Sequence, residues 1–364
     1  MYERAQVRAW GDTMAVIAAL TRCSAAACVS LVSMAIALAT YAMPAAAQES
    51  EQAFFAGKTV RLVVGFGPGG GYDSYARMLA PYLSRTLNAS VIVENRPGAG
   101  GLVALNGVYM APADGLTIMI VNGTGAAYSQ LTDQQGARYD LAKLGYVATL
   151  SAPPSLWTVG THVGTKSITD AIKSGRKWRW AASGPVDSLS DGAAFTCEAF
   201  KLDCQIVLGY KGSNDAALAV SRGEMDALYV TDTSANHYVQ ANDIIALATV
   251  GRSRSRFFPE LPTVFEATRL NADQEWLFDF RHQVQNLGRI LVVPPGMPES
   301  RLSFLEAATA KAVSDPQFLA EGDKRQLYTN YVDAAGTRKN AMSIVTAITP
   351  EQKKLVHDIL ARAR

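Results

Sequence analysis

The sequence predicts an α/β protein built from two doubly wound units. Apolar runs without polar alternation, such as Thr59–Phe66 (TVRLVVGF) and Leu116–Val121 (LTIMIV), are separated by helical stretches. Strands that are hydrophobic throughout are typical of a parallel sheet covered by helices on both faces. The alternation recurs from Trp178–Ser183 (WRWAAS) onward, and 364 residues are enough for two domains.

Each unit follows the same order of elements. In the first, helices are expected over 72–87 and 102–110, with a strand at 91–93 between them. In the second, the expected elements are a helix at 187–200, a strand at 205–208, a helix at 214–222 and strands at 227–230 and 244–250. A Pro-rich connector (257–263) precedes the strand 290–293, and Pro294–Pro298 precedes a helix at 299–314.

This order predicts a second lobe inserted into a discontinuous first lobe. The expected ranges are 48–150 and 248–364 for the first lobe and 151–247 for the second, with crossover strands near residues 150 and 247. No role is assigned to the polar stretch Asn271–Gly288.

The first 47 residues have the pattern of an export signal. Arg4, Arg8 and Arg22 precede an uncharged stretch, Cys23–Gln48, and three alanines end at Ala47. A basic start, an apolar middle and small residues at the end predict a signal peptide over 1–47, cleaved after Ala47, and a periplasmic location. A membrane-spanning anchor of the same length is the alternative.

The overall composition excludes some classes of protein. A formal charge of +2 and 18% charged residues argue against a nucleic-acid binder. Histidines are scattered, so no metal site is expected. After cleavage only Cys197 and Cys204 remain, and in an oxidising compartment they form either a disulfide or two buried thiols.

The glycine-rich segment Gly65–Asp73 matches a cofactor fingerprint. Gly65, Gly67 and Gly70 fit G-x-G-x-x-G between a strand and a helix, and Glu94 follows about 24 residues on. This pattern would make the chain a nicotinamide-dependent oxidoreductase, which is the enzyme alternative.

Three features count against a dinucleotide. Pro68 removes an amide donor from the loop, Asp73 would repel a phosphate at the helix start, and the chain carries an export signal. Glycines and free amides at a helix start suit a smaller anion such as a carboxylate. A tight turn without a ligand is the alternative for this segment.

Catalytic signatures are missing from the sequence. It contains no G-x-S-x-G elbow, Walker A motif or H-E-x-x-H pair, and Cys197 and Cys204 do not form C-x-x-C. We therefore expect a protein that is not an enzyme and that carries no cofactor.

A series of motifs between Gly57 and Leu319 resembles the substrate-binding components of tripartite tricarboxylate transporters, the TctC-like or Bug receptors. The motifs are VRLVVGFGPGGGYDSYAR (60–77), VIVENRPGAGG (91–101), APADG (111–115), NGT (122–124), SGP (183–185), YKG (210–212), RGEMD (222–226), LPTVFEA (261–267), PPGMP (294–298) and SDP (314–316).

The resemblance implies a type II periplasmic-binding-protein fold, with two lobes and a ligand cleft between them. It implies a monomeric solute-binding protein that captures a small organic acid by closure of the lobes and delivers it to integral membrane transporter subunits. A sensory receptor for a membrane kinase is the alternative within the same class.

The resemblance also assigns ligand-binding positions. Two arginines that suit a carboxylate by charge, Arg77 and Arg289, are expected to have surface roles. For three of the assigned positions a structural role is the alternative to ligand binding. Asp73 and Asp232 could each cap a helix, and Tyr210 could pack at the hinge. The assigned positions are Phe66, Pro68, Gly69, Gly70, Gly71, Tyr72 and Asp73 from the first loop, Asn122, Gly123 and Thr124 after the third strand, and Ser183, Gly184, Ser188, Tyr210 and Asp232 from the second lobe.

Two departures from the family pattern bear on the ligand. Tyr72 replaces a small or hydroxyl residue, and Val186-Asp187 replaces a small pair. An acidic residue at 187 disfavours a second carboxylate nearby, and Tyr72 could stack on an aromatic group. A monocarboxylate, aromatic in character, is the resulting hypothesis.

Overall fold

The structure is a computed structural model that describes residues 51–241, 244–327, 329–346 and 348–361. The predicted signal peptide, residues 1–47, lies outside the described residues. The chain from Phe55 to Arg364 forms one compact unit, which contains two five-stranded sheets.

The first sheet has the strand order β2-β1-β3-β10-β4. β1 pairs in parallel with β2 and β3, whereas β10 is antiparallel to both β3 and β4. Every residue of β3 and β10 is buried, as expected for apolar strands covered on both faces. The bounds are β1 (Thr59–Val64), β2 (Ser90–Asn95), β3 (Thr117–Asn122), β4 (Gly145–Ser151) and β10 (Arg289–Val293).

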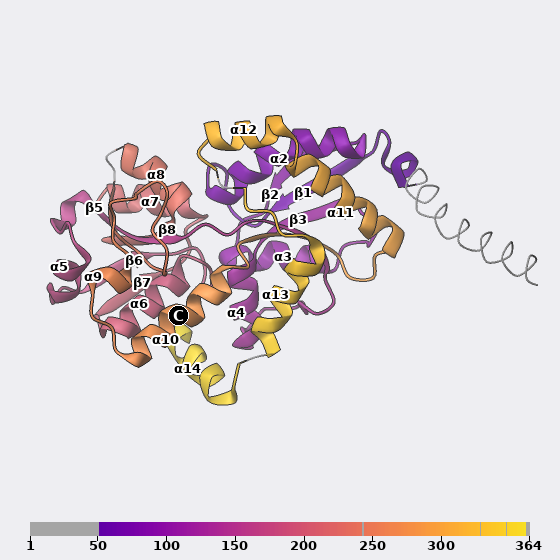
Figure 1. Cartoon of the computed structure of the whole chain (residues 1–364). Helices are drawn as coiled ribbons and strands as arrows, with labels where there is room; N and C mark the ends of the chain where they lie inside the picture. The colour runs from indigo at the N-terminus through magenta and orange to yellow at the C-terminus, as the bar shows by residue number, and fades with distance from the viewer. Residues whose placement is uncertain (1–50, 242–243, 328, 347, 362–364) are drawn as a thin grey trace, which may run out of the picture. The chain divides into compact units, whose positions relative to one another are not determined.

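The second sheet repeats this arrangement in the order β7-β6-β8-β5-β9. β6 is parallel to β7 and β8, and β5 is antiparallel to β8 and β9. In Figure 1, β1, β2 and β3 of the first sheet are purple, and β6, β7 and β8 of the second sheet are pink. The bounds are β5 (Ser155–Gly160), β6 (Trp178–Ala181), β7 (Cys204–Val207), β8 (Ala227–Thr231) and β9 (Ile244–Thr249).

The prediction of purely parallel sheets is wrong for one strand in each sheet. β5 and β10 are the strands through which the chain enters one lobe from the other, and both run against their neighbours. The first crossing is the short segment 152–154 between β4 and β5. The chain returns only at β10, so the second sheet includes β9, which extends beyond the expected boundary at residue 247.

Helices cover both sheets. In the first lobe α2 contacts β1 and β2, α11 packs on α2, and α13 packs on β4, while in the second lobe α6 and α7 contact β6 and β8. The bounds are α2 (Gly71–Leu87), α3 (Leu102–Tyr109), α4 (Gly123–Leu131), α5 (Ile168–Lys173), α6 (Ser190–Phe200), α7 (Ser213–Ser221), α8 (Asp232–Gln240), α9 (Val264–Ala267), α10 (Ala272–Gln285), α11 (Glu299–Val313), α12 (Pro316–Lys324), α13 (Ala334–Thr346) and α14 (Pro350–Ala361), with short 3-10 turns η1 (Ala99–Gly101) and η2 (Thr161–Val163).

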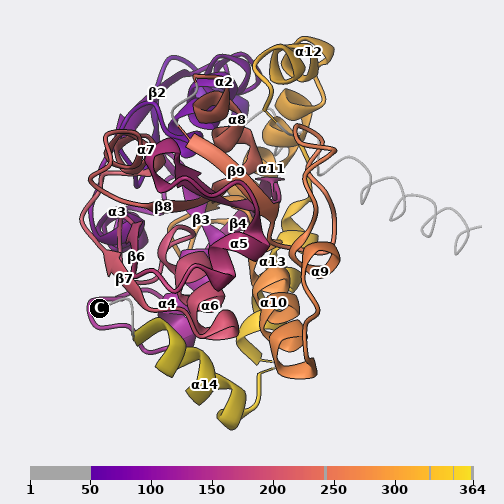
Figure 2. The same ribbon diagram turned by 90° about the vertical axis from the view of Figure 1, so that its left-hand side faces the viewer.

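The polar stretch Asn271–Gly288, which has no role assigned from the sequence, contains α10, and this helix links the lobes. A capping box between Asn271 and Gln274 starts the helix, and the Gln274 side chain also donates to the Ala199 carbonyl of α6 at 2.7 Å. At the other end, Gln285 donates to the Pro153 carbonyl of the first crossing at 2.7 Å. Figures 1 and 2 show α10 beside α6, which also packs against α14.

Aromatic side chains join α10 to both lobes. Phe280 of α10 lies 6.3 Å from Tyr128 of α4 and 6.5 Å from Phe195 of α6, measured between ring centroids. Tyr128 and Phe195 are 5.7 Å apart. The apolar core is therefore continuous at the base of the lobes.

In the second lobe Cys197 of α6 and Cys204 at the start of β7 form a disulfide, with Cα atoms 6.3 Å apart. Beside this region three fully buried tryptophans, Trp157, Trp178 and Trp180, contact one another across β5 and β6. Their fluorescence reports the packing of this lobe.

We predict that replacing both Cys197 and Cys204 by alanine lowers the free energy of unfolding by about 2.5 kcal/mol, because a cross-link of this loop length restricts the unfolded chain by that amount. Urea unfolding followed by tryptophan fluorescence measures the change. A reductant should destabilise the wild type to a similar extent and leave the variant unchanged. A reductant effect on the variant would contradict the assignment.

Candidate functional site

The carboxyl ends of the parallel strands in both sheets lead into helix starts. β1 continues through the glycine loop, residues 65–73, into α2, and β3 ends at Asn122 before α4. In the second sheet β8 ends at Thr231 before α8. Open α/β sheets bind ligands at this edge of their strands, so these loops form the candidate site.

A cavity of about 20 Å³ lies at this edge, between the two lobes. About 10–15 Å³ of such space holds one water molecule, so the lobes are closed against each other. The lining residues are Phe66, Gly70, Gly71, Tyr72 and Arg289 from the first lobe, and Ser188, Leu189, Ser213, Val230, Thr231 and Ser234 from the second.

Arg289 is the cationic side chain of this cavity. It starts β10 directly opposite Asn122 of β3, and only 2% of it is exposed. Its Nη1 donates to Ser151 Oγ at 3.2 Å and its Nη2 to Thr231 Oγ1 at 3.3 Å, while Nε has no partner. Within the described parts of the chain its hydrogen-bond partners are neutral hydroxyls, and no carboxylate pairs with it.

Aromatic rings surround the guanidinium group. It lies 5.1 Å from the ring centroid of Tyr72 and 4.4 Å from that of Tyr75, in the range of cation–π attraction. Tyr72 stacks on Phe66 with centroids 4.7 Å apart. Burial raises the pKa of Tyr72 against the opposing effect of Arg289, so its hydroxyl is neutral and can donate.

The glycine loop contacts the second lobe through its backbone. The Gly67 amide donates to the Lys211 carbonyl at 2.6 Å. A Cβ at Gly70 would lie 3.4 Å from Ser213 Oγ, and one at Gly71 would lie 2.8 Å from Nη2 of Arg289. Gly70 and Gly71 line the cavity at the start of α2, and a side chain at Gly71 would collide with Arg289.

Asp73 braces this loop from within. Its Oδ2 accepts from the Gly69 amide and from Arg77 Nε, and its Oδ1 accepts from Asn95, each at 2.9 Å. Burial opposes ionisation, but these bonds outweigh it and lower the pKa of Asp73. Gly69 has φ +83°, a left-handed conformation that favours glycine.

A second carboxylate, Asp187, organises the facing loop between β6 and α6. Its Oδ2 accepts from the Ser183 amide at 3.0 Å, from the Ser183 hydroxyl and from the Gly184 amide at 2.8 Å. Its Oδ1 accepts from the amides of Leu189 at 2.9 Å and Ser190 at 2.8 Å. Asp187 is fully buried.

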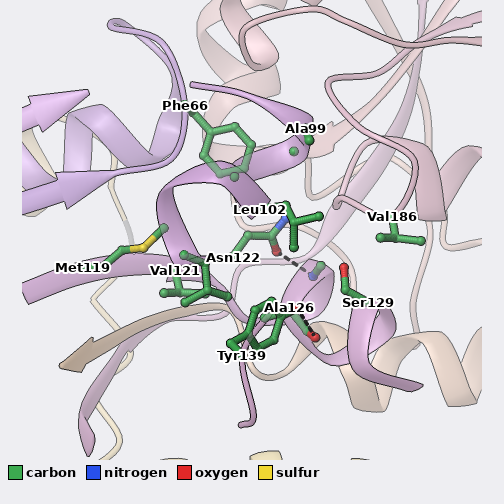
Figure 3. Close-up of a pocket in the computed structure, with 14 residues that line it drawn as sticks. Phe66, Ala99, Leu102, Met119, Val121, Asn122, Ala126, Ser129, Tyr139 and Val186 are labelled. Carbon is green, nitrogen blue, oxygen red and sulfur yellow. Dashed lines mark hydrogen bonds between the residues drawn. The ribbon is translucent and has the colours of Figure 1, made fainter. Parts of the chain in front are cut away.

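A neighbouring cavity, also about 20 Å³, shares Phe66 with the first one (Figure 3). Its lining is largely apolar and includes Val186 of the second lobe. Among its polar residues, Asn122 caps α4 by accepting from the Gly125 amide at 3.1 Å. The Asn122 side-chain amide nitrogen is buried without a partner.

Comparison with known proteins identifies the family. The sequence profile of the tripartite tricarboxylate transporter family receptor, TctC, matches residues 75–346. The chain belongs to the TctC family. As a TctC/Bug protein it is a periplasmic solute-binding protein, as the motif series predicts.

Relatives of known sequence agree with this assignment. A UPF0065 protein of Bordetella pertussis is 27% identical over 290 residues, which cover 78% of this chain and 84% of the relative. Protein BugT of the same organism is 25% identical over 241 residues, covering 65% of this chain and 72% of BugT.

Solved structures share the fold. MatC from Rhodopseudomonas palustris with bound malate has a TM-score of 0.69 at 20% identity, over 83% of this chain and 99% of MatC. R. palustris Rpa4515 with adipate has a TM-score of 0.70 at 19% identity, over 84% of this chain and 97% of that protein. The periplasmic binding protein BugD has a TM-score of 0.69 at 20% identity, over 83% and 97%. The two-lobed periplasmic-binding-protein fold is thus confirmed.

Across the described parts of this TctC protein, no helix combines the length and apolar character needed to cross a bilayer.

The structure brings some of the positions assigned from sequence into the cleft. Phe66, Gly70, Gly71, Tyr72 and Ser188 line the first cavity. Ser183 and Gly184 belong to the loop held by Asp187. Pro68 and Gly69 are exposed on the glycine loop.

Other assigned positions lie outside the two cavities. Gly123 donates to the Gly288 carbonyl just after α10, and Thr124 Oγ1 donates to the Val284 carbonyl in the last turn of α10. Tyr210 packs against the apolar core of the second lobe. Asp232 is fully buried and accepts from Ser255 Oγ at 2.6 Å.

Residues of the glycine loop and the predicted ribose partner make contacts within the chain instead of leaving groups free for a dinucleotide. The Gly69 amide is used by Asp73. Glu94, the predicted ribose partner, accepts two hydrogen bonds from Arg96 at 2.8 and 2.9 Å. Neither contact favours a bound dinucleotide.

Arg289 is the principal site residue that the sequence reasoning misplaced. The expectation of a surface role is wrong, because β10 is antiparallel and its first residue therefore lies at the carboxyl edge of β3. The available signal was a charged residue at the head of an otherwise apolar strand, RILVV. Arg77, in contrast, has a half-exposed side chain paired with Asp73. Five further lining residues were also not predicted: Leu189, Ser213, Val230, Thr231 and Ser234.

A buried ion pair lies at the base of the lobes. Arg281 of α10 contacts Asp191 Oδ1 of α6 at 3.1 Å, and both side chains are almost fully buried. The guanidinium group of Arg281 also lies 4.2 Å from the ring centroid of Tyr229. Burial raises the pKa of Asp191 to about 6, although Arg281 opposes the shift; the nearby Asp187 adds to it.

This pair predicts a pH dependence of stability. The folded chain retains the Asp191 proton up to about pH 6, whereas an unperturbed carboxyl releases it near 3.8. Its contribution to stability is therefore complete below pH 4 and is lost as the pH rises to about 6. The difference in unfolding free energy between wild type and Asp191→Asn should fall over this range. A constant difference would refute the shifted pKa.

Closure of the cleft depends on a close approach at Gly184. A Cβ there would lie 2.5 Å from the Gly100 nitrogen of the first lobe. We predict that Gly184→Ala holds the lobes apart, increases the radius of gyration in small-angle scattering and weakens ligand binding. Gly107→Ala, whose Cβ has no atom nearer than 4.0 Å, is the matched control. Unchanged closure in Gly184→Ala would contradict this arrangement.

Proposed function

We propose that this TctC protein captures a small carboxylate ligand by closing its lobes and, as a monomer, delivers it to the membrane subunits of a tripartite tricarboxylate-type transporter. The observation that carries the proposal is the buried Arg289 guanidinium group, which faces the amide-rich start of α2 without a carboxylate partner among the described residues.

The physical argument rests on charge. Burying a cation is unfavourable unless an anion and hydrogen bonds compensate for it. Here the surrounding side chains supply hydroxyls and aromatic rings, which stabilise the cation only in part. A carboxylate on the ligand would supply the missing anion for Arg289. An arginine side chain presents two parallel N–H donors that match the two oxygens of a carboxylate.

The helix and the second lobe add further donors. The amides of Gly71 and Tyr72 lie at the positive end of α2, where negative charge is favoured. Ser188, Ser213 and Ser234 place hydroxyl groups on the opposite wall. A ligand held from both sides would favour the closed state over the open one.

Closure follows from the size of the cavity. Its volume of about 20 Å³ suits a water-sized group, so a larger solute needs the lobes to separate before it enters. Direct contacts such as Gly67 to Lys211 would break on opening and re-form on closing. The closed lobes would then present the surface that the membrane subunits recognise.

The named relatives are consistent with this proposal. Two proteins of the same fold were solved with malate and with adipate, which are both carboxylates. We also propose export through the signal at residues 1–47, with cleavage after Ala47. N-terminal sequencing of the exported protein would then read Gln48 first.

We predict that Arg289→Gln weakens carboxylate binding roughly tenfold to a hundredfold, because hydrogen bonds to charged groups are worth about 1.5–3 kcal/mol. Arg289→Lys should be intermediate, since it keeps the charge and loses the fork geometry. Calorimetric titration with hexanoate, benzoate, malate and adipate measures the affinities.

Arg85→Gln is the matched control, because this arginine lies at the exposed end of α2. NAD is included as the rival ligand. Stabilisation by NAD alone, or equal carboxylate affinity in wild type and Arg289→Gln, would overturn the proposal.

A further inference from the structure

The second lobe contains a set of donors shaped for an anion. Four backbone amides and one hydroxyl converge at the start of α6, an 11-residue helix. Amides converging at a helix start form a typical anion-binding arrangement. Both oxygens of the Asp187 carboxylate fill it, and each oxygen accepts at least two of the donated bonds.

This carboxylate comes from the chain itself. Asp187 lies between the donors and the first lobe, because a Cβ at Gly100 would be 2.9 Å from Asp187 Cβ and 3.4 Å from its Oδ2. Throughout the described chain no lysine or arginine pairs with Asp187. Its charge is balanced by the amides and the Ser183 hydroxyl, so the arrangement has no capacity for a second anion.

Arg289 and Asp187 thus give the two sides of the cleft opposite electrostatic character. Both side chains lie close enough to Tyr72 to act on the pKa of its hydroxyl group, which Arg289 lowers and Asp187 raises. A ligand carboxylate near Arg289 is attracted to the guanidinium group. A carboxylate near Asp187 is repelled, and the amides that could bind it already donate to Asp187.

We infer that Asp187 is a built-in carboxylate that occupies the anion subsite of the second lobe, so that the ligand is a monoanion with its single carboxylate at Arg289. This inference rests on the proposed function and specifies its substrate class. The uncharged remainder of the ligand would extend past Phe66 toward the neighbouring cavity, whose lining is largely apolar.

The built-in carboxylate can be tested without knowing the ligand. In an Arg289→Gln background, which removes the other anion subsite, Asp187→Gly should lower the melting temperature. Sodium formate at pH 7 should then restore a large part of the loss in a saturable manner, relative to sodium chloride at the same ionic strength. Asp187→Asn is the control, because its N–H groups would face the amide donors and leave no place for formate.

Formate should raise the melting temperature of the Asp187→Gly variant and leave its Arg289→Gln parent unchanged. An equal rise in both proteins, or no loss of stability in Asp187→Gly, would overturn the inference. Circular dichroism confirms that the variants are folded before the comparison.

The substrate class is tested with ligands of equal length and different charge. Wild type should bind hexanoate more tightly than adipate, and benzoate more tightly than terephthalate. Asp187→Gly should shift the preference toward the dicarboxylate by about tenfold or more, since it frees charge-assisted hydrogen bonds for the second carboxylate.

The two proposals fail in different ways. Tighter binding of adipate than of hexanoate by the wild type would overturn the monoanion inference and leave carboxylate capture intact. Binding of none of these acids, together with stabilisation by NAD, would overturn carboxylate capture itself, and the formate result would still decide whether Asp187 fills an anion site.

Discussion

The structure depends on two strands that reach their sheets from the opposite lobe. β5 and β10 run antiparallel to their neighbours, so the first residue of each lies at the carboxyl edge of the other strands. For β10 that residue is Arg289, which is carried into the cleft by chain direction alone. The same connection places α10 between the lobes, where its aromatic and polar side chains join α4, α6 and the first crossing.

The charged side chains in and below the cleft differ in whether groups of the chain itself compensate their charge. Asp73 and Asp187 each satisfy amides of their own loop, and Asp191 pairs with Arg281 at the base. These carboxylates are structural because each accepts at least one hydrogen bond from within the chain. Arg289 differs, since its partners are neutral. Such an imbalance in a buried site is the physical basis for expecting an anionic ligand there.

The glycine loop shows how one motif supports different functions. Its spacing fits a dinucleotide fingerprint, yet its amides face a cavity closed by the second lobe, and Asp73 takes the Gly69 amide. What the loop binds is therefore set by the residues opposite it. A phosphate site would need free donors where this chain has a carboxylate.

By itself the sequence determined the elements, the two-lobed α/β class, the family and the glycine loop, because apolar runs and glycine spacing are local properties. The direction of β10, the burial of Arg289 and the donors gathered around Asp187 were decided only by tertiary structure. Strand direction depends on which lobe the chain arrives from, and an arginine at a strand end has the same local sequence whether it faces solvent or a cleft. Asp187 was recognised as a departure from the family pattern, but its bonds to four amides required the folded loop.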